Sequence, residues 1–389
     1  MRIINVVGAR PNFMKIAPLI HAIEHHNQLN GDVSNLIDHL LVHTGQHYDD
    51  KMSRSFFEAL NIPEADINLG IGSGTHAEQV GHTMIAFEKV LKEHKPDWVI
   101  VVGDVNATCA CSITAKKEHV KVAHVEAGLR SFDLKMPEEI NRMVTDRLSD
   151  LLLTPCKISC DNLKAEGVLN GRIRFVGNIM IDTLEAQREK ASLLDIEDII
   201  LKNQLTGDLT TKIPRLDRFA VMTLHRPSNV DTKEVLESIV CFLCDEVAED
   251  MPLLWPIHPR AMKQLKTFGL WDKAVSTENL ILLHPLGYHE LLRLNMDAEI
   301  MLTDSGGLQE ECCVLGTPCL TLRWNTERPV TLQEHGGASV LVGNNVNRLR
   351  EAYQGALSIK RNPQRPELWD GRTAQRIVEA LLEQDGIPV

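Results

Sequence analysis

The stretch Trp98-Val-Ile-Val-Val-Gly-Asp104 decides the fold, because an unbroken apolar run leads directly into a glycine and a carboxylate. Short apolar runs of this kind are typical of strands that are buried on both faces of a parallel sheet. The chain repeats the pattern, and longer amphipathic stretches separate one run from the next. This strand–helix–strand order predicts the α/β class, in which helices cover parallel sheets.

The apolar runs form two sets, with a charged region from residue 179 to residue 216 between them. The first set comprises Ile3–Val7, Leu40–His43, Trp98–Val102, Val120–Val125 and Leu151–Leu153. The second set comprises Phe219–Leu224, Leu253–Ile257, Ile281–Leu283, Ile300–Leu302 and Cys319–Leu322. We therefore predict an N-terminal domain at 1–178 and a C-terminal domain at 179–368. The remaining residues, 369–389, contain a predicted helix at Thr373–Gln384, which could pack back on the N-terminal domain or on the other half.

Polar and charged residues gather directly after the predicted strands of both sets. They are Gly8-Ala-Arg10-Pro, Gly103-Asp104, Glu126-Ala-Gly, His225-Arg226 and Asp304-Ser305-Gly306-Gly307. In open parallel sheets, ligands bind in the crevice outside the carboxyl ends of the strands. Because both halves carry such residues, we predict two Rossmann-like, doubly wound domains that face each other across a cleft and share one site.

Composition and charge exclude several classes of protein. The chain has 389 residues, of which 41 are Lys or Arg and 53 are Asp or Glu, so its formal net charge is −12. This balance argues against a protein that mainly coats nucleic acid or an anionic membrane, and an anionic ligand must be met by local cations. No apolar run approaches the roughly 20 residues of a membrane span, and the N-terminus shows no signal-peptide cleavage region. We expect a cytoplasmic protein.

The cysteines and histidines do not indicate a metal site. Nine cysteines are scattered through the chain, and the single metal-like spacing, Cys241-Phe-Leu-Cys244, lies in an apolar stretch without a second ligand pair. Sixteen histidines form no His-Glu-x-x-His pattern. We expect reduced thiols and no catalytic metal.

Two strand–helix turns suit a phosphate. In Gly8-Ala-Arg10-Pro, a tight turn presents backbone N–H groups beside Arg10 and Lys15, although an ordinary turn with surface cations explains the pattern equally well. In the second turn, Ser305, Gly306 and Gly307 open a helix whose N-terminus could bind a phosphate, and Glu311 could accept hydrogen bonds from a ribose diol. The alternative for the second turn is simple helix capping by Asp304 or Ser305.

Three carboxylates mark the candidate catalytic site. Asp104 and Glu126 each follow an apolar strand, and Glu138 lies in the loop that leaves this region. Carboxylates whose pKa values differ with their environment move protons on and off carbon or oxygen, although helix capping and surface charge remain alternatives. His225 and Arg328 add cations from the second half. Acids from one half and cations from the other suit a sugar attached to a diphosphate.

A set of motifs in chain order resembles the non-hydrolysing UDP-N-acetylglucosamine 2-epimerases. The motifs are Gly8-Ala-Arg10-Pro-x3-Lys15, Thr44-Gly-Gln46-His47, Gly103-Asp104, His124-Val-Glu126-Ala-Gly-Leu-Arg130, Pro137-Glu138-Glu139-x-Asn141-Arg142, Val176-Gly-Asn178, His225-Arg226, Asp304-Ser-Gly-Gly-x-Gln-Glu-Glu311 and Thr326-Glu-Arg328-Pro. They span nearly the whole chain, which makes the resemblance far more specific than any one motif.

The resemblance implies the GT-B fold, an active site between two Rossmann-like domains, no cofactor, and commonly a homodimer. It also implies that UDP is eliminated across C1 and C2 to give a 2-acetamidoglucal, after which UDP adds back with a proton on the opposite face of C2. The implied catalytic residues are Asp104, Glu126, Glu138 and His225. Arg10, Lys15, His225 and Arg328 would hold the leaving UDP, while Ser305, Gly306, Gly307 and Glu311 would contact its phosphate and ribose.

Several positions depart from the commonest family pattern. Asn12 stands where a Glu is frequent, the segment His225-Arg-Pro-Ser-Asn229 lacks the frequent Glu two residues after Arg226, and Leu286 stands where many members have a Gln near the uracil. We expect these departures to alter sugar specificity or regulation rather than the chemistry. The Gln46-His47 segment differs from the form associated with activation by a second substrate molecule, so such activation is in doubt.

Four other functions remain alternatives. They are a hydrolysing epimerase, a 2-epimerase of a related nucleotide sugar such as a 2,3-diacetamido uronic acid, a GT-B glycosyltransferase, and a non-catalytic nucleotide-sugar sensor. Gly8-Ala-Arg10-Pro and Glu126 favour the non-hydrolysing form, and three carboxylates exceed what a transferase requires. We predict no nucleic-acid partner and no membrane partner.

Overall fold

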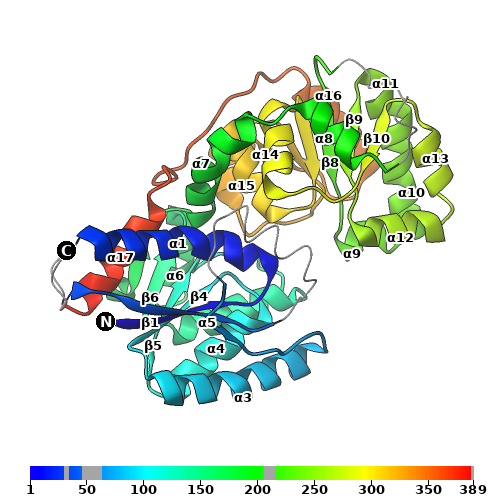
Figure 1. Ribbon diagram of the computed structural model, residues 1–389. Coiled ribbons are helices and arrows are strands. Elements are labelled where there is room, and N and C mark those ends of the chain that lie inside the picture. The colour runs from blue at the N-terminus through cyan, green and yellow to red at the C-terminus, as the bar shows by residue number, and fades with distance from the viewer. Residues whose placement is uncertain (30–34, 46–63, 206–215, 387–389) are drawn as a thin grey trace. The chain divides into compact units, whose positions relative to one another are not determined.

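A computed structural model describes residues 1–29, 35–45, 64–205 and 216–386 of the chain. The predicted Gln46-His47 segment lies outside the described residues. The chain divides into two compact units (Figure 1). Unit 1 consists of residues 1–186 and 367–389, and unit 2 consists of residues 187–366. Each unit contains one parallel sheet and is described by itself.

Unit 1 is built on a seven-stranded parallel sheet with the strand order β3-β2-β1-β4-β5-β6-β7. Its strands are β1 (Arg2–Val7), β2 (Asp38–His43), β3 (Ile67–Asn68), β4 (Trp98–Val102), β5 (Lys121–Val125), β6 (Leu151–Thr154) and β7 (Ile173–Phe175). Its helices are α1 (Arg10–Leu29), α3 (His76–His94), α4 (Asn106–Lys117), α5 (Pro137–Leu148), α6 (Lys157–Ala165), the 3-10 turn η2 (Asn170–Arg172), the start of α7 (Ile179–Ser192), and α17 (Thr373–Gln384). One core cluster packs Ile4, Val6 and Val101 against Phe87 of α3.

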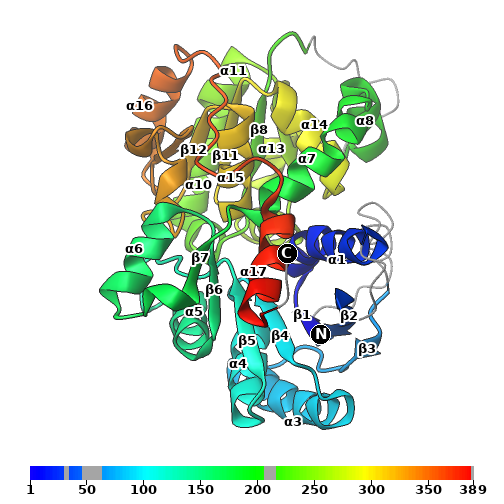
Figure 2. The same ribbon diagram turned by 90° about the vertical axis from the view of Figure 1, so that its left-hand side faces the viewer.

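The predicted C-terminal helix is present with the predicted bounds, and it belongs to unit 1. α17 packs beside α1, as both views show (Figures 1 and 2). The carboxylate of Asp182 accepts hydrogen bonds from the backbone N–H groups of Thr373 (3.0 Å) and Ala374 (2.7 Å) at its N-terminus. Trp369, which is fully buried, donates to the carbonyl of Pro155 at 2.9 Å. These bonds anchor the returning chain to unit 1.

Unit 2 is built on a six-stranded parallel sheet with the strand order β10-β9-β8-β11-β12-β13. Its strands are β8 (Ala220–Thr223), β9 (Leu253–Pro256), β10 (Leu280–Leu283), β11 (Ile300–Thr303), β12 (Cys319–Thr321) and β13 (Ser339–Leu341). Its helices and helical turns are the end of α7, α8 (Ile196–Asn203), α9 (Pro227–Val230), α10 (Lys233–Phe242), η3 (Leu243–Val247), α11 (Ala248–Asp250), α12 (Pro259–Thr267), α13 (Trp271–Ser276), α14 (Tyr288–Asp297), α15 (Gly306–Leu315), η4 (Pro329–Thr331), η5 (Gln333–His335) and α16 (Val346–Ala356). Apolar clusters lie on both faces of this sheet.

The ten predicted strands are all present, and the described residues form three further strands that were not predicted. These are β3, β7 and β13, which are short and lie at sheet edges. The charged region after residue 178 is helical, and the division between the units falls inside α7. The predicted domain boundary, between residues 178 and 179, coincides with the start of that helix.

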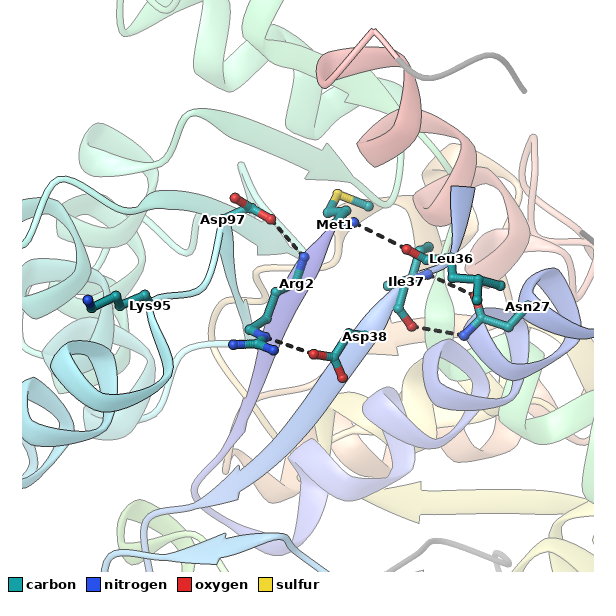
Figure 3. A pocket seen from close by; sticks show the side chains of 8 residues that line it. All are labelled: Met1, Arg2, Asn27, Leu36, Ile37, Asp38, Lys95 and Asp97. Carbon is teal, nitrogen blue, oxygen red and sulfur yellow. Dashed lines mark hydrogen bonds and ion pairs between the residues drawn. The ribbon is translucent and has the colours of Figure 1, made fainter. Parts of the chain in front are cut away.

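A surface pocket lies at the amino ends of the unit 1 strands (Figure 3). Its lining residues are Met1, Arg2, Asn27, Leu36, Ile37, Asp38, Lys95 and Asp97. The guanidinium of Arg2 is paired with Asp38 at 2.7 Å, and Asp97 accepts the Arg2 backbone N–H. The pocket therefore lies at the opposite end of the strands from the predicted site. Within the described part of the chain, no helix is both long and apolar enough to cross a membrane.

Candidate active site

The strand order of unit 1 brings three polar segments to one edge of the sheet. β4 lies between β1 and β5, and the register pairs Val6 with Val101 and Val102 with Val125. The residues that directly follow these strands are Gly8, Gly103 and Glu126, so they meet at the carboxyl edge. This edge is where an open parallel sheet binds its ligand.

A buried ion pair between Lys15 and Glu126 forms the centre of this edge. The Lys15 Nζ lies 2.5 Å from the Glu126 Oε2, and both side chains are almost completely buried. Glu126 has a φ of 73°, in the left-handed region that side-chain-bearing residues rarely adopt. Such strained conformations cluster at functional sites, because the surroundings must hold them in place.

Gly103 makes room for the ion pair. Its φ is +69°, and a Cβ added there would lie 3.2 Å from the Lys15 Nζ and 3.4 Å from the Asn12 Nδ2. Asn12 is buried, and both ends of its amide make local hydrogen bonds: its Oδ1 accepts from the N–H groups of Gly8 and Ala9 at 3.0 Å, and its Nδ2 donates to the Val102 carbonyl at 3.0 Å. An ionised glutamate could not donate this last bond. Asn12 thus fixes the turn between β1 and α1.

Asp104 is held by a different cation. The buried guanidinium of Arg142, from α5, bonds both the Asp104 carboxylate and the buried carboxylate of Glu139. Burial by itself raises the pKa of Glu139, but hydrogen bonds from the Ser131 backbone and from Arg142 outweigh it and hold the pKa below its ordinary value. Arg142 therefore fixes Asp104 at the edge through a charge-assisted network.

Glu138 is placed apart from this network. It is exposed on the first turn of α5, whereas its neighbour Glu139 is buried. Among the described residues, no hydrogen bond or ion pair joins Glu138 to Asp104 or Glu126. The convergence of all three acids on one crevice stays a prediction.

A second buried hydrogen-bond network lies next to the carboxyl edge of the unit 1 sheet. The His124 ring lies between the Asp146 carboxylate (Nδ1 to Oδ1, 2.6 Å) and the Gly103 carbonyl (Nε2 to O, 2.8 Å). Asp146 also accepts from the Gly128 backbone N–H and from the Arg130 guanidinium, at 3.1 and 2.7 Å. The network ties Gly103 and the segment after Glu126 to α5, and so fixes the backbone on which both acids stand.

The carboxyl edge of the unit 2 sheet carries the predicted cations and the phosphate turn. β8 and β11 are neighbours, so His225 and Asp304 meet where these strands end. The His225 Nδ1 lies 2.7 Å from the Asp304 Oδ1, and the Asp304 side chain is fully buried while that of His225 is 43% exposed. An imidazole thus stands at the surface with one nitrogen held by a buried carboxylate.

The turn after β11 leaves the N-terminus of α15 without a side-chain cap. Ser305 is the N-cap residue, but its hydroxyl makes no capping hydrogen bond, and neither alternative of simple capping by Asp304 or Ser305 is observed. The Arg328 guanidinium lies against this N-terminus and pairs with Glu310 at 2.7 Å and with Glu327. The first N–H groups of α15 and a fixed cation are therefore adjacent, as a phosphate site requires.

Glu311 is buried inside unit 2, beside Tyr288 and Asn295 of α14. Burial, opposed only in part by hydrogen bonds from these two side chains, raises the pKa of Glu311 from its ordinary 4.5 to about 7. The sequence predicts that Glu311 contacts a ribose. The ribose contact stays a prediction. With a pKa of about 7, the carboxyl group of Glu311 is readily protonated near neutral pH.

Replacing Glu311 with glutamine is expected to stabilise the ligand-free protein above pH 7. A carboxyl group with a raised pKa in the folded state contributes stability below about pH 4.5, and this contribution is lost as the pH rises through about 7. The pKa shift corresponds to about 3 kcal/mol of unfolding free energy that the wild-type protein loses as the pH rises. Glutamine does not ionise, so Glu311→Gln should not show this loss. Urea unfolding at pH 5 and pH 8 checks this. Parallel pH curves for the two proteins would contradict it.

Gly306 is required by the position of Arg328. A Cβ at Gly306 would lie 2.7 Å from one terminal nitrogen of that guanidinium and 3.0 Å from Glu327 Oε1, whereas a Cβ at Gly307 would meet nothing within 4 Å. We expect Gly306→Ala to break the buried pairs of Arg328 and to lower the free energy of unfolding by about 1–3 kcal/mol. Gly307→Ala is the matched control and should cause no loss. Equal unfolding midpoints for the two variants would refute this account.

The predicted cations Arg10 and Arg328 differ in how they are placed. Arg10 is the first residue of α1, but its side chain lies outside the described part of the structure, and Arg328 is buried rather than open. The sequence predicts no site role for Arg142, and for Asp304 it offers only helix capping. The sequence signal for both residues is that they lie after or near strands. It identifies them only when the order of the strands in the sheet is known.

Comparison with known proteins identifies the class. The family model for UDP-N-acetylglucosamine 2-epimerase matches residues 31–382, and the chain belongs to this family of isomerases. Its two parallel sheets with alternating helices agree with the predicted α/β, GT-B class. A relative from Methanocaldococcus jannaschii, named UDP-N-acetylglucosamine 2-epimerase, is 43% identical over 383 residues, covering 98% of this chain and 99% of the relative.

Two further comparisons bear on the ligand. The crystal structure of an M. jannaschii UDP-GlcNAc 2-epimerase, in complex with UDP-GlcNAc and UDP, has a TM-score of 0.86 and 42% identity, covering 98% of this chain and 100% of that one. A Pseudomonas aeruginosa UDP-2,3-diacetamido-2,3-dideoxy-D-glucuronate 2-epimerase is 36% identical over 387 residues, covering 98% of this chain and 100% of the relative. The chain is thus similar to epimerases of two related nucleotide sugars.

Proposed function

We propose that the chain is a non-hydrolysing epimerase that inverts C2 of UDP-N-acetylglucosamine to give UDP-N-acetylmannosamine. The observation that carries the proposal is the pair of fixed carboxylates, Asp104 and Glu126, at the ends of neighbouring strands in a chain of this family. The 43% identity to the archaeal epimerase over nearly the full length supports the substrate.

The proposed reaction is redox-neutral, so it needs no oxidant or reductant. A carboxylate removes the C2 proton, the C2–H electrons form the C1=C2 bond, and the C1–O bond breaks with its electron pair leaving on the UDP oxygen. In the reverse addition, a proton is delivered to the opposite face of C2 and the UDP oxygen bonds C1 again. Inversion at C2 thus requires a proton-transfer group on each face, for which Asp104, Glu126 and Glu138 are the proposed residues.

The cations have a separate task in this proposal. Elimination places charge on the diphosphate, which must stay bound until it adds back. His225, Arg328, the α15 N-terminus at Ser305–Gly307 and, by resemblance, Arg10 would hold it. The Lys15 ammonium is paired with Glu126, and this pairing supports a role in positioning that carboxylate as well as in binding the phosphate. Glu311 would contact the ribose.

Turnover in deuterated water tests the function. UDP-N-acetylglucosamine should give UDP-N-acetylmannosamine with deuterium at C2, detected by NMR and mass spectrometry. Release of free N-acetylmannosamine would instead indicate a hydrolysing enzyme, and no change of the substrate without an acceptor would favour a glycosyltransferase or a sensor.

The second candidate substrate is the 2,3-diacetamido uronic acid nucleotide, which the 36% identical P. aeruginosa relative favours. Parallel assays with both sugars distinguish the candidates, because the true substrate should have the higher kcat/KM. We also propose a cytoplasmic homodimer that serves polysaccharide biosynthesis, which the family resemblance supports. Analytical ultracentrifugation checks the dimer, and a monomer at micromolar concentration would contradict it.

A further inference from the structure

We propose that Asp304 is the positioning residue for His225: its buried carboxylate holds the Nδ1–H of the imidazole, so that Nε2 is directed to the diphosphate of the nucleotide. This inference rests on the proposed function, because it assigns a partner to a residue of that site. The resemblance and the comparisons attach no role to Asp304. Its place in the fold, one strand away from His225, carries the inference.

The carboxylate of Asp304 is fully buried and is surrounded by donors. It lies 2.7 Å from the His225 Nδ1, and it accepts from the backbone N–H groups of His225 (3.0 Å) and Arg226 (2.8 Å) and from the Asn229 Nδ2 (3.0 Å). The Arg226 Nε also donates to the Asp304 carbonyl at 2.9 Å. Asp304 therefore fixes both the backbone and the ring of His225, and a change of its position would move the imidazole.

The charge of Asp304 decides which ring nitrogen carries a proton. Burial by itself raises the pKa of Asp304, but the hydrogen bond and charge of His225 and the two backbone N–H groups outweigh it and hold the pKa below its ordinary value. An ionised carboxylate only accepts hydrogen bonds, so Nδ1 must be the protonated nitrogen. The remaining nitrogen is Nε2, and the His225 side chain as a whole is 43% exposed.

Neighbouring groups do not compete for this role. The His258 ring lies 5.6 Å from the His225 ring, centroid to centroid, and burial together with the charge of His225 lowers the pKa of His258. The guanidinium of Arg260 is bonded to Asp231. His225 is thus the side chain that the buried carboxylate of Asp304 directly supports.

This arrangement fits the charge that develops during elimination. When the C1–O bond breaks, its electron pair moves onto the diphosphate, and a protonated His225 can donate from Nε2 to that oxygen. The hydrogen bond between Nδ1 and Asp304 fixes the orientation of the ring, as a buried carboxylate does for histidines in other enzymes. When UDP adds back, the same donor releases the oxygen to C1.

A double-mutant cycle tests the proposal with UDP-N-acetylglucosamine as substrate. Asp304→Asn and His225→Asn should each lower kcat about a hundredfold or more, as loss of a preorganised donor does. If Asp304 acts through His225, adding Asp304→Asn to His225→Asn should cost less than about threefold further. Losses that multiply in the double variant would overturn the proposal.

Two further measurements separate positioning from mere structural support. Asn229→Ala removes another donor to the same carboxylate without touching the His225 ring; it should lower Tm yet change kcat far less than Asp304→Asn. Equal kcat losses in these two variants would count against the proposal. In the unmodified protein, NMR should detect a hydrogen-bonded Nδ1–H proton of His225, and a ring protonated only at Nε2 would overturn the proposal even if Asp304→Asn fails to fold. If the wild-type protein does not epimerise the sugar, the proposed function fails, while the NMR result still decides the role of Asp304.

Discussion

Epimerisation by Glu126→Gln is expected to be about a thousandfold slower than by the wild-type protein, because the amide cannot take or deliver the C2 proton. Glu126 is the acid with the most constrained surroundings: a buried ammonium 2.5 Å away, a left-handed backbone, and a glycine that leaves space for the pair. Each of these features restricts the carboxylate to a single orientation. Loss of its charge should therefore affect the chemical step rather than substrate binding.

The experiment measures kcat, deuterium incorporation at C2, and UDP affinity. Glu118→Gln, a substitution of a partly exposed glutamate 3.9 Å from Lys92, is the matched control and should retain full activity. Because the amide leaves the Lys15 ammonium buried without a charged partner, we also expect a lower urea midpoint, so activity is assayed without denaturant. A Glu126→Gln enzyme with wild-type kcat would remove Glu126 from the mechanism.

Arg142→Met is expected to lower the free energy of unfolding by about 3–5 kcal/mol, since it leaves a buried carboxylate without its cation. The Arg142 guanidinium is almost fully buried and bonds Glu139 and Asp104 at the same time. Glu139 in turn accepts the backbone N–H groups of Ser131 and Phe132. Loss of the cation should therefore loosen both the loop before α5 and the position of Asp104.

Two comparison variants are measured beside Arg142→Met by urea unfolding. Arg142→Lys keeps a charge but loses the planar fork that spans two carboxylates, so its loss should be intermediate. Arg147→Met changes an exposed arginine on the same helix and should shift stability by less than about 0.5 kcal/mol. If Arg142→Met and Arg147→Met unfold at the same urea concentration, the network around Arg142 does not stabilise the protein.

The fold was predictable where apolar runs are long and unpredictable where strands are short. The run at Trp98–Val102 and the others like it became strands, because their residues can be buried on both faces. β3 has two residues, and β7 and β13 have three each, so none contains a run long enough to stand out from a loop. The amphipathic pattern at Thr373–Gln384 gave both bounds of α17, but only tertiary packing decides which unit it joins.

The candidate site was predictable in residue type but not in partnership. Lys15 was expected near a phosphate, and the structure pairs it with Glu126, because α1 follows β1 and β1 lies beside β4. The sequence cannot tell which of Glu138 and Glu139 turns inward, since the loop at Ser131 that receives Glu139 forms only in the folded chain. Asp304 contacts His225 only because β8 and β11 are neighbours in the sheet. Local sequence patterns do not predict this strand order.

The discontinuity of unit 1 has a consequence for how the chain is made. A ribosome releases α1 early, but α17, whose Ile377, Val378 and Leu381 are buried, follows only after all of residues 187–366. Unit 2 is one continuous segment and can complete its core during synthesis. The apolar surface of α1, in contrast, is not covered until α17 has been synthesised. Chaperones would meet this surface on the nascent chain, and a premature stop before Thr373 would release a complete unit 2 joined to an unfinished unit 1.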